Sequence, residues 1–360
     1  MDKSAINLFG MPRGELESMF SDLGEKPFRA RQVMQWIYGR SVYETDEMTD
    51  LSLALRARLA DRVTFTLPEV LCREDATDGV IKWRINAGGG QAIETVFIPE
   101  DGRGTLCVSS QVGCAMDCPF CATGRQGFNR NLTTAEIIGQ LHLARLEASC
   151  RVSNVVFMGM GEPLANLSAV ARATDIMLDD LGFGLSRRRV TVSTSGLVPQ
   201  IKRLATLSNV ALAVSLHAPD DELRNQLVPI NRRHPIAQLL AACWDYARVT
   251  RSKEVTFEYV MLAGVNDSAV HAQRLARLLM GHPAKVNLIP FNEFPDTNFR
   301  RSPDQVVERF RQILVNAGII TITRKTRGDD IAAACGQLAG RVTNRIRSPL
   351  GDKMNRDVLR

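Results

Sequence analysis

The chain has 360 residues and is 45% hydrophobic, which allows one large domain and a smaller one whose cores need no disulfide bonds. No apolar run approaches the length of a membrane span and the N-terminus has no apolar signal region, so we expect a cytoplasmic protein with no membrane partner. The formal net charge of +6 shows that the chain is basic, which is a weak indication that nucleic acid is a partner.

Residues 1–62 are predicted to form a small helical accessory domain. Apolar residues recur at helical spacing in residues 12–23, Pro27 stands where a first helical turn would begin, and a further helical segment follows in residues 51–59. Arginines accompany the second and third segments: Arg29, Arg31, Arg40, Arg56, Arg58 and Arg62. They suit phosphate contacts with RNA and the solvated surface of a helical bundle equally well.

Residues 63–98 are predicted to form a short β-hairpin connector. Apolar and polar residues alternate in residues 80–85, and residues 92–98 are strand-like. Between them, the glycines at 88–90 predict the turn of a hairpin. We expect this small sheet to bridge the helical domain and the rest of the chain.

Residues 99–340 alternate between predicted strands and helices. The expected strands are 105–111, 153–159, 188–194, 209–216, 254–261, 285–290 and 319–324. Thr133 and Glu136 predict a capping box for the helix that follows the first of them. The repetition predicts an α/β fold with a parallel sheet, and about six units fit a partial (β/α)6 barrel better than a full eightfold one. Residues 341–360 form a basic tail that we expect to be mobile or to contact RNA.

Cys114, Cys118 and Cys121 form a C-x3-C-x2-C loop directly after the first predicted barrel strand. Three thiolates can hold three irons of a [4Fe-4S] cluster and leave the fourth iron open to a substrate. This spacing resembles that of radical S-adenosylmethionine (SAM) enzymes, in which SAM chelates the open iron. A zinc loop is the alternative, but zinc favours paired C-x2-C units, and the sequence has no second pair.

Polar residues follow several of the other predicted strands, at the end where barrel enzymes carry their chemistry. A glycine–glutamate motif of radical-SAM enzymes, which holds the SAM amino group, resembles residues 158–163 here. The resulting SAM-binding candidates are Gly161, Glu162, Ser193, Ser215, Leu216, His217 and Asn292. Taken singly, each is equally consistent with a turn or a helix cap. We interpret His217 as a hydrogen-bonding group, because no metal-binding partner stands near it in the sequence.

Cys107 and Cys335 lie outside the cysteine loop, and either one alone is consistent with a structural thiol. Cys335, however, stands in a glycine-flanked segment after the last predicted strand, which could bring it over the barrel mouth. Cys72, Cys150 and Cys243 are interpreted as structural.

These motifs together resemble one family, the radical-SAM adenine-C2 methyltransferases of 23S rRNA and tRNA (the RlmN family). The resemblance covers nearly the whole chain and rests on residues 93–96, 114–121, 158–163, 215–219, 289–292 and 327–338. It implies methylation of adenine 2503 in 23S rRNA and adenine 37 in tRNA by a monomer that draws electrons from a reductant such as flavodoxin. Two alternatives stay open: a Cfr-type enzyme that methylates adenine C8, and an RNA-binding protein with a structural or redox-sensing Fe–S loop.

The resemblance also implies a mechanism that uses two SAM molecules per turnover. Adenine C2 is not nucleophilic, so the methyl group is first placed on Cys335 and then activated as a radical that adds to C2. Cys107 would resolve the protein–RNA link by forming a disulfide with Cys335. The family's proton acceptor corresponds to Glu94, but the sequence leaves open whether Glu94 or Cys107 takes the C2 proton. The target base must be drawn out of its RNA fold.

Overall fold

A ten-stranded sheet forms the centre of this computed structural model, which describes residues 6–252, 254–295 and 297–343. Across the sheet the strands are β14 (Ile320–Thr323), β13 (Ala284–Pro290), β12 (Val255–Met261), β11 (Ala211–Ser215), β10 (Val190–Thr194), β9 (Val152–Phe157), β6 (Arg103–Cys107), β5 (Ala92–Glu100), β4 (Ile81–Asn86) and β3 (Val70–Asp75). The pairs from β14 to β6 are parallel, as predicted. In the described residues β14 and β3 do not pair with each other, so the sheet stays open like a partial barrel.

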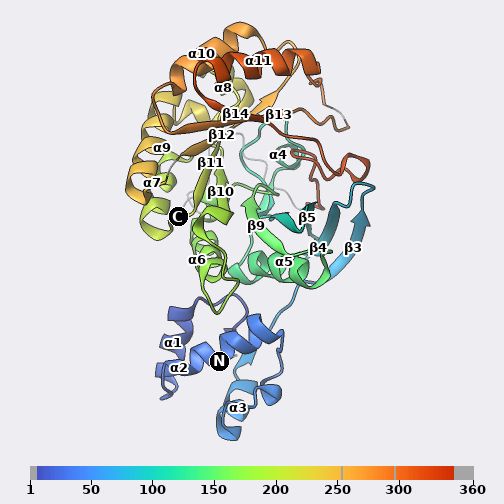
Figure 1. Cartoon of the computed structure of the whole chain (residues 1–360). Coiled ribbons are helices and arrows are strands. Elements are labelled where there is room, and N and C mark those ends of the chain that lie inside the picture. The colour runs from blue at the N-terminus through green and yellow to red at the C-terminus, as the bar shows by residue number, and fades with distance from the viewer. Residues whose placement is uncertain (1–5, 253, 296, 344–360) are drawn as a thin grey trace.

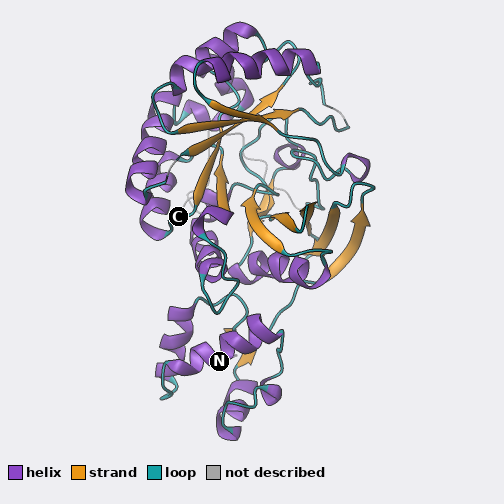
Figure 2. Ribbon diagram, viewed as in Figure 1, coloured by secondary structure: helices purple, strands orange, loops and turns teal. Residues whose placement is uncertain are grey.

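Helices cover the outer face of the parallel strands, and Figure 2 shows the strands enclosed by them. They are α5 (Thr134–Glu147), α6 (Leu167–Leu178), α7 (Val198–Leu207), α8 (Asp221–Leu227), α9 (Ile236–Thr250), α10 (Ala269–Leu279) and α11 (Asp304–Asn316). The predicted capping box at the start of α5 is confirmed, because Thr133 and Glu136 each accept a hydrogen bond from the other's backbone N–H. Fully buried aromatic residues such as Phe157, Phe257 and Tyr259 fill the core beneath these helices.

The predicted hairpin is present as β4 and β5, with positive φ angles at the glycines of residues 88–90. It does not form a small sheet of its own. Strands β3 to β5 pair antiparallel and extend the main sheet, because β5 also pairs with β6. Since β5 runs across residue 98, the structure shows no break at the predicted boundary between connector and barrel.

The predicted strand 105–111 is divided in two. The strand β6 ends at Cys107, and β7 (Gln111–Gly113) pairs instead with β8 (Phe128–Asn131). The interruption has a tertiary cause: Ser109 donates its backbone N–H to Gln140 of α5 and its hydroxyl to the backbone oxygen of Glu94. The chain therefore leaves the sheet before it reaches the cysteine loop.

The predicted front helices form a separate lobe below the barrel in Figure 1. They are α1 (Arg13–Asp22), α2 (Phe28–Met34), which continues as a π-helical turn over Gln35–Gly39, and α3 (Leu53–Ala60). A short parallel pair, β1 (Ile6–Asn7) and β2 (Val63–Thr64), joins the ends of the lobe. The lobe contacts α5 and α6 through Arg145, which donates to the backbone oxygen of Tyr38, and through the pair of Arg172 and Glu15.

Gly10 brings the front lobe directly against α5. Its φ is +101°, and a Cβ atom there would lie 2.5 Å from the backbone nitrogen of Ala135. We therefore expect Gly10→Ala to destabilise the protein by about 2 kcal/mol and to loosen the lobe. The control is Gly14→Ala in α1, where an added Cβ atom would have no atom within 4 Å outside the adjacent helix backbone, and alanine favours the helix. Urea unfolding and limited proteolysis measure both effects, and equal stability of the two variants would contradict the prediction.

The C-terminal end of the described chain runs back beside the hairpin, where Arg341 bridges to Ala92. The rest of the predicted basic tail, residues 344–360, lies outside the described residues. Among the helices that the structure describes, none is long and apolar enough to cross a membrane.

Candidate active site

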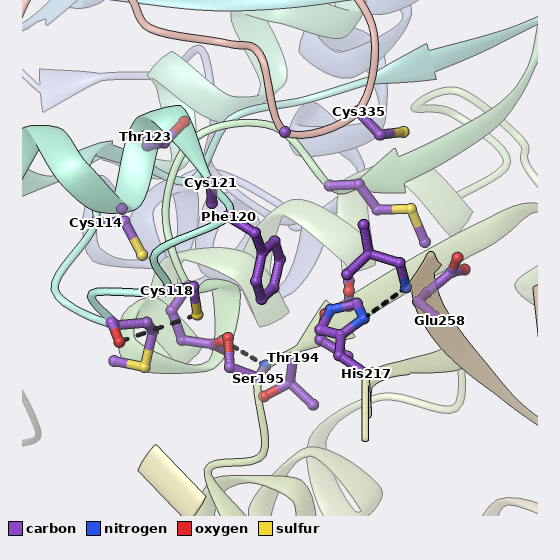
Figure 3. A pocket seen from close by; sticks show the side chains of 18 of the residues that line it. Cys114, Cys118, Phe120, Cys121, Thr123, Thr194, Ser195, His217, Glu258 and Cys335 are labelled. Carbon is purple, nitrogen blue, oxygen red and sulfur yellow. Dashed lines mark hydrogen bonds between the residues drawn. The ribbon is translucent and has the colours of Figure 1, made fainter. Parts of the chain in front are cut away.

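A cavity with about 970 Å³ of empty volume opens at the carboxyl ends of the parallel strands. Figure 3 shows the cysteine loop on one side of it and His217 and Glu258 on the other. Segments that follow β7, β9, β10, β11 and β13 supply the lining, so residues from most of the chain meet in one place. This is the position that barrel enzymes use for chemistry.

Cys114, Cys118 and Cys121 all line this cavity. The loop is closed at its base by a hydrogen bond of 2.9 Å from the Cys114 backbone N–H to the Gly127 oxygen. A Cβ atom at Gly113 would lie 2.0 Å from that same oxygen, so the residue before the loop must be glycine. The helix α4 (Ala122–Gln126) follows the third cysteine immediately.

The three thiols fit a [4Fe-4S] cluster better than a single ion. Burial raises the pKa of Cys114, Cys118 and Cys121, so these thiols need a bound cation to become thiolates. In the described part of the chain no three cysteine, histidine or acidic side chains converge as ligands of one ion. In a cubane cluster each thiolate binds a different iron, and three thiols around one cavity suit that arrangement.

Glu162 is a buried carboxylate in the same cavity. Its oxygens accept hydrogen bonds from the backbone N–H groups of Leu164, at 3.0 Å, and Ser195, at 2.7 Å. Burial raises the pKa of the carboxyl, and these hydrogen bonds oppose that effect. Gly161, with φ +99°, allows the turn because a Cβ atom there would lie 2.5 Å from Gln111.

His217 lines the cavity in a fixed, neutral form. Its Nδ1 accepts a hydrogen bond of 3.0 Å from the Val260 backbone N–H, and its ring meets Phe120 edge to face. Burial, aided by the nearby Arg224, lowers the pKa of His217 to about 3. At neutral pH the ring therefore offers only the Nε2 proton to a ligand.

The other predicted SAM ligands fall into three groups. Ser193 and Ser215 line the cavity. Leu216 is buried, and its side chain is not part of the lining; its backbone oxygen accepts a hydrogen bond from Arg224. Asn292 lines an adjoining cavity and donates a hydrogen bond of 3.2 Å to the backbone oxygen of Cys335.

The adjoining cavity, with about 1500 Å³ of empty volume, brings Cys107 and Cys335 together. Cys107 is buried, and burial followed by the charge of Cys335 raises the pKa of Cys107 to about 12. Cys335 is exposed and also lines the first cavity. Arg324 lies between the cavities and donates to the Cys335 sulfur at 3.5 Å. The two cysteines thus differ: one is a buried thiol, and the other is open to both cavities.

Hydrogen bonds on either side hold the segment that carries Cys335. The backbone N–H of Ala122 donates to the Gly336 oxygen at 2.9 Å, and the Thr123 hydroxyl donates to the Leu338 oxygen at 2.5 Å. On the opposite side, Gln337 donates to the backbone oxygen of Glu293 at 2.9 Å.

Glu94 lies outside the lining of both cavities. Its side chain is buried, lies 3.6 Å from Arg84, and accepts a hydrogen bond of 3.1 Å from the Ala339 backbone N–H. Of the three predicted catalytic residues, the structure therefore brings Cys107 and Cys335 into a common cavity and places Glu94 behind the segment that carries Cys335.

Sequence reasoning missed three charged residues: Arg224, Glu258 and Arg324. Arg224 is fully buried and donates to the backbone oxygens of Ser195 and Ser215, which fixes two strand ends. Glu258 pairs with Arg324 at 3.3 Å beside the first cavity. For Glu258, the available signal was a charged residue inside a strand, 255–261, that is apolar apart from Thr256.

The comparisons with known proteins agree across the chain. The family model "Ribosomal RNA large subunit methyltransferase N-terminal domain" matches residues 6–65, and the model of the radical SAM superfamily matches residues 108–276. A dual-specificity RNA methyltransferase RlmN of Alkalilimnicola ehrlichii is 56% identical over 345 residues, which cover 95% of this chain and 96% of that protein. The crystal structure of a radical SAM methyltransferase from Sphaerobacter thermophilus is 46% identical, with a TM-score of 0.85, over 92% of this chain and 99% of that chain. The chain therefore belongs to the RlmN family of radical-SAM RNA methyltransferases.

Proposed function

We propose that the protein methylates C2 of adenine 2503 in 23S rRNA and of adenine 37 in tRNA. The observation that carries this proposal is the pair of unlike thiols, Cys107 and Cys335, in a cavity that adjoins the one lined by the cysteine loop. A single structural Fe–S loop needs no such second pair. Adenine C2 is a poor nucleophile, so its methylation needs a carrier that can be activated and then released.

Cys114, Cys118 and Cys121 would hold the [4Fe-4S] cluster of this family. When bound and supplied with an electron by a reductant such as flavodoxin, the cluster supports reductive cleavage of SAM. Glu162 is proposed to receive the SAM ammonium group, because its carboxylate lines the cavity, accepts hydrogen bonds from the backbone N–H groups of Leu164 and Ser195, and pairs with no cation in the described part of the chain. Ser193, His217 and the other strand ends supply polar contacts. We propose that a monomer uses two SAM molecules in each turnover.

Cys335 is proposed to accept the first methyl group. Its sulfur loses a proton and forms a bond to the methyl carbon, and S-adenosylhomocysteine leaves. Its exposure to both cavities lets the same sulfur meet SAM on one side and an adenine on the other. Arg324, which donates to this sulfur, favours the negative charge needed for the attack.

Cys107 is proposed to release the product. Its sulfur attacks the Cys335 sulfur and forms a disulfide, the carbon–sulfur bond breaks, and the departing carbon keeps the electron pair and takes a proton to become the methyl group. For removal of the C2 proton, Cys107 and Glu94 are both candidates. Cys107 lines the cavity but would first have to lose its own proton, because burial raises the pKa of its thiol to about 12. Glu94 accepts a hydrogen bond from the backbone N–H of Ala339, behind the segment that carries Cys335.

Nucleoside analysis of rRNA and tRNA from a strain that lacks the protein tests the proposal. We expect 2-methyladenosine to disappear from both RNAs; its persistence would end the assignment. Loss of 8-methyladenosine instead would identify the Cfr-type activity. Absence of 5′-deoxyadenosine after incubation of the holoenzyme with SAM and dithionite would favour an RNA-binding protein without radical chemistry.

The front lobe is proposed to bind RNA phosphates. Arg31 and Arg62 are exposed and have no ion pair within the part of the chain that the structure describes. Replacing both with Gln is expected to weaken RNA binding several-fold at low salt and to flatten its salt dependence. Cleavage of SAM without RNA should be unchanged. The control is Arg248→Gln, an exposed arginine on α9, and equal RNA affinity in both variants would show that the front arginines only face solvent.

A further inference from the structure

Glu258 is a buried carboxylate in the first cavity whose purpose the proposed chemistry leaves unexplained. It lies on β12, where the sheet register sets it opposite Ser215 of β11 and Asn287 of β13. Its side chain is 4% exposed and lines the cavity, and Figure 3 shows it across from the cysteine loop.

The two oxygens of Glu258 have different surroundings. Oε1 accepts hydrogen bonds from Asn287, at 2.9 Å, and from Arg324, at 3.3 Å. Oε2 is buried and accepts no hydrogen bond from any residue that the structure describes. A buried carboxylate oxygen without a donor is costly, so its presence in a ligand cavity indicates that a ligand supplies the missing donor.

The charge around Glu258 indicates which kind of donor this is. Arg324 already neutralises the carboxylate, so the free oxygen suits a neutral donor. Glu162 is different: in the described residues no cation pairs with it, which suits an ammonium group. Glu162 and the free oxygen of Glu258 are therefore suited to different parts of SAM: Glu162 to the ammonium group, and Glu258 to a neutral donor.

SAM has two kinds of neutral donor that could meet the free oxygen, the ribose hydroxyls and the adenine amine, and the position of Glu258 favours the ribose hydroxyls. One nitrogen of Arg324 reaches the Glu258 carboxylate, and the other reaches the Cys335 sulfur at 3.5 Å. A single guanidinium group thus bridges Glu258 and the sulfur that is proposed to take the methyl group. In SAM the ribose is joined through a single carbon to the sulfonium, whereas the adenine lies beyond the ribose.

We propose that Glu258 Oε2 accepts a hydrogen bond from a ribose hydroxyl of SAM, an inference that rests on the proposed function. Through Oε1 the same carboxylate holds Arg324 against Cys335. The pair of Glu258 and Arg324 then connects the ribose of the methyl donor to the sulfur that receives the methyl group. Arg324 acts here as a positioning residue.

Calorimetric titration of the anaerobic holoenzyme with S-adenosylhomocysteine and its 2′-deoxy and 3′-deoxy analogues tests the contact. In the wild type, loss of one hydroxyl is expected to weaken binding about tenfold, as for a hydrogen bond to a charged group. In Glu258→Met, S-adenosylhomocysteine should bind about tenfold more weakly, and loss of that hydroxyl should have no further effect. Arg324→Met retains Oε2 and should retain the dependence on the hydroxyl.

The double variant Glu258→Met/Arg324→Met removes the buried carboxylate together with its partly exposed cationic partner, and keeps the test usable if the single variant unfolds. It too should show no penalty for the deoxy analogue. Glu136→Gln, at the start of α5, is the control for general loss of stability and should keep the full penalty. A hydroxyl penalty that persists in the Glu258 variants would overturn the proposal, as would a Glu258-dependent penalty for a purine analogue that lacks the adenine amine. A wild-type holoenzyme that does not bind S-adenosylhomocysteine would contradict the proposed function instead.

Discussion

Replacing Cys107 with Ala is expected to trap a covalent adduct between the protein and its RNA. This variant keeps Cys335, the proposed methyl carrier, and the cysteine loop, so addition to the adenine can still occur. The link then has no free thiol to attack it. Apart from Cys335, the cysteines that line the adjoining cavity are Cys107 and Cys121, and Cys121 is proposed to be bound to the cluster. Turnover should fall at least a thousandfold, since resolution of a covalent intermediate is lost. A denaturing gel of protein purified from cells should show the adduct as a nuclease-sensitive band.

Two further variants separate this outcome from simple damage. Cys335→Ala removes the carbon carrier, and in combination with Cys107→Ala it should remove the adduct. Were both cysteines merely structural, each replacement would cost only about 1–3 kcal/mol of stability and would leave no adduct. Normal turnover of Cys107→Ala, or an adduct that survives in the double variant, would overturn the assigned roles.

Replacing Cys114, Cys118 or Cys121 with Ala is expected to abolish all radical chemistry. Each thiol is proposed to hold one iron, and the loop offers no fourth cysteine as a substitute. The brown absorbance of the reconstituted protein, its iron content and the release of 5′-deoxyadenosine should all be lost. A variant that retained full iron content would contradict the ligand assignment.

The other cysteines of the chain provide matched controls. Cys72 and Cys150 are partly exposed, whereas Cys243 is buried within α9. Their replacement by Ala should leave the absorbance and SAM cleavage intact, with a stability cost of about 1 kcal/mol for the buried residue. Loss of the cluster in Cys243→Ala with the fold preserved would show that the ligands are different.

Local sequence patterns predicted the strands, helices and turns well where the structure depends on residues that are close together in the sequence. The alternation of β and α segments predicted the parallel sheet, and the glycines at 88–90 predicted the hairpin turn. They failed at residues 105–111, because the interruption depends on Gln140, which lies 31 residues away from Ser109 in the sequence. A side-chain partner at that separation leaves no periodic signal.

The residues of the candidate site differ in the same way: some carry a local sequence signal and others do not. Motifs with fixed local spacing, such as the cysteine loop and residues 158–163, could be found in the sequence alone. The pair of Glu258 and Arg324 could not, because its members are 66 residues apart and meet only when β12 and β14 lie in one sheet. For Glu94, the family resemblance pointed to the residue, but only the fold shows that its carboxylate bonds to the backbone at Ala339.

The anchored segment around Cys335 has a consequence for the order of events in turnover. Because hydrogen bonds hold this segment on both sides, the Cys335 sulfur does not swing between separate binding sites as a lipoyl or biotin arm does. Under the proposed mechanism, the SAM that donates the methyl group and the SAM that is later cleaved would therefore bind in the same cavity, one after the other. Each turnover would then include an exchange of S-adenosylhomocysteine for fresh SAM while Cys335 carries the methyl group. S-adenosylhomocysteine should consequently compete with both SAM molecules, so that its release would limit the rate of the enzyme.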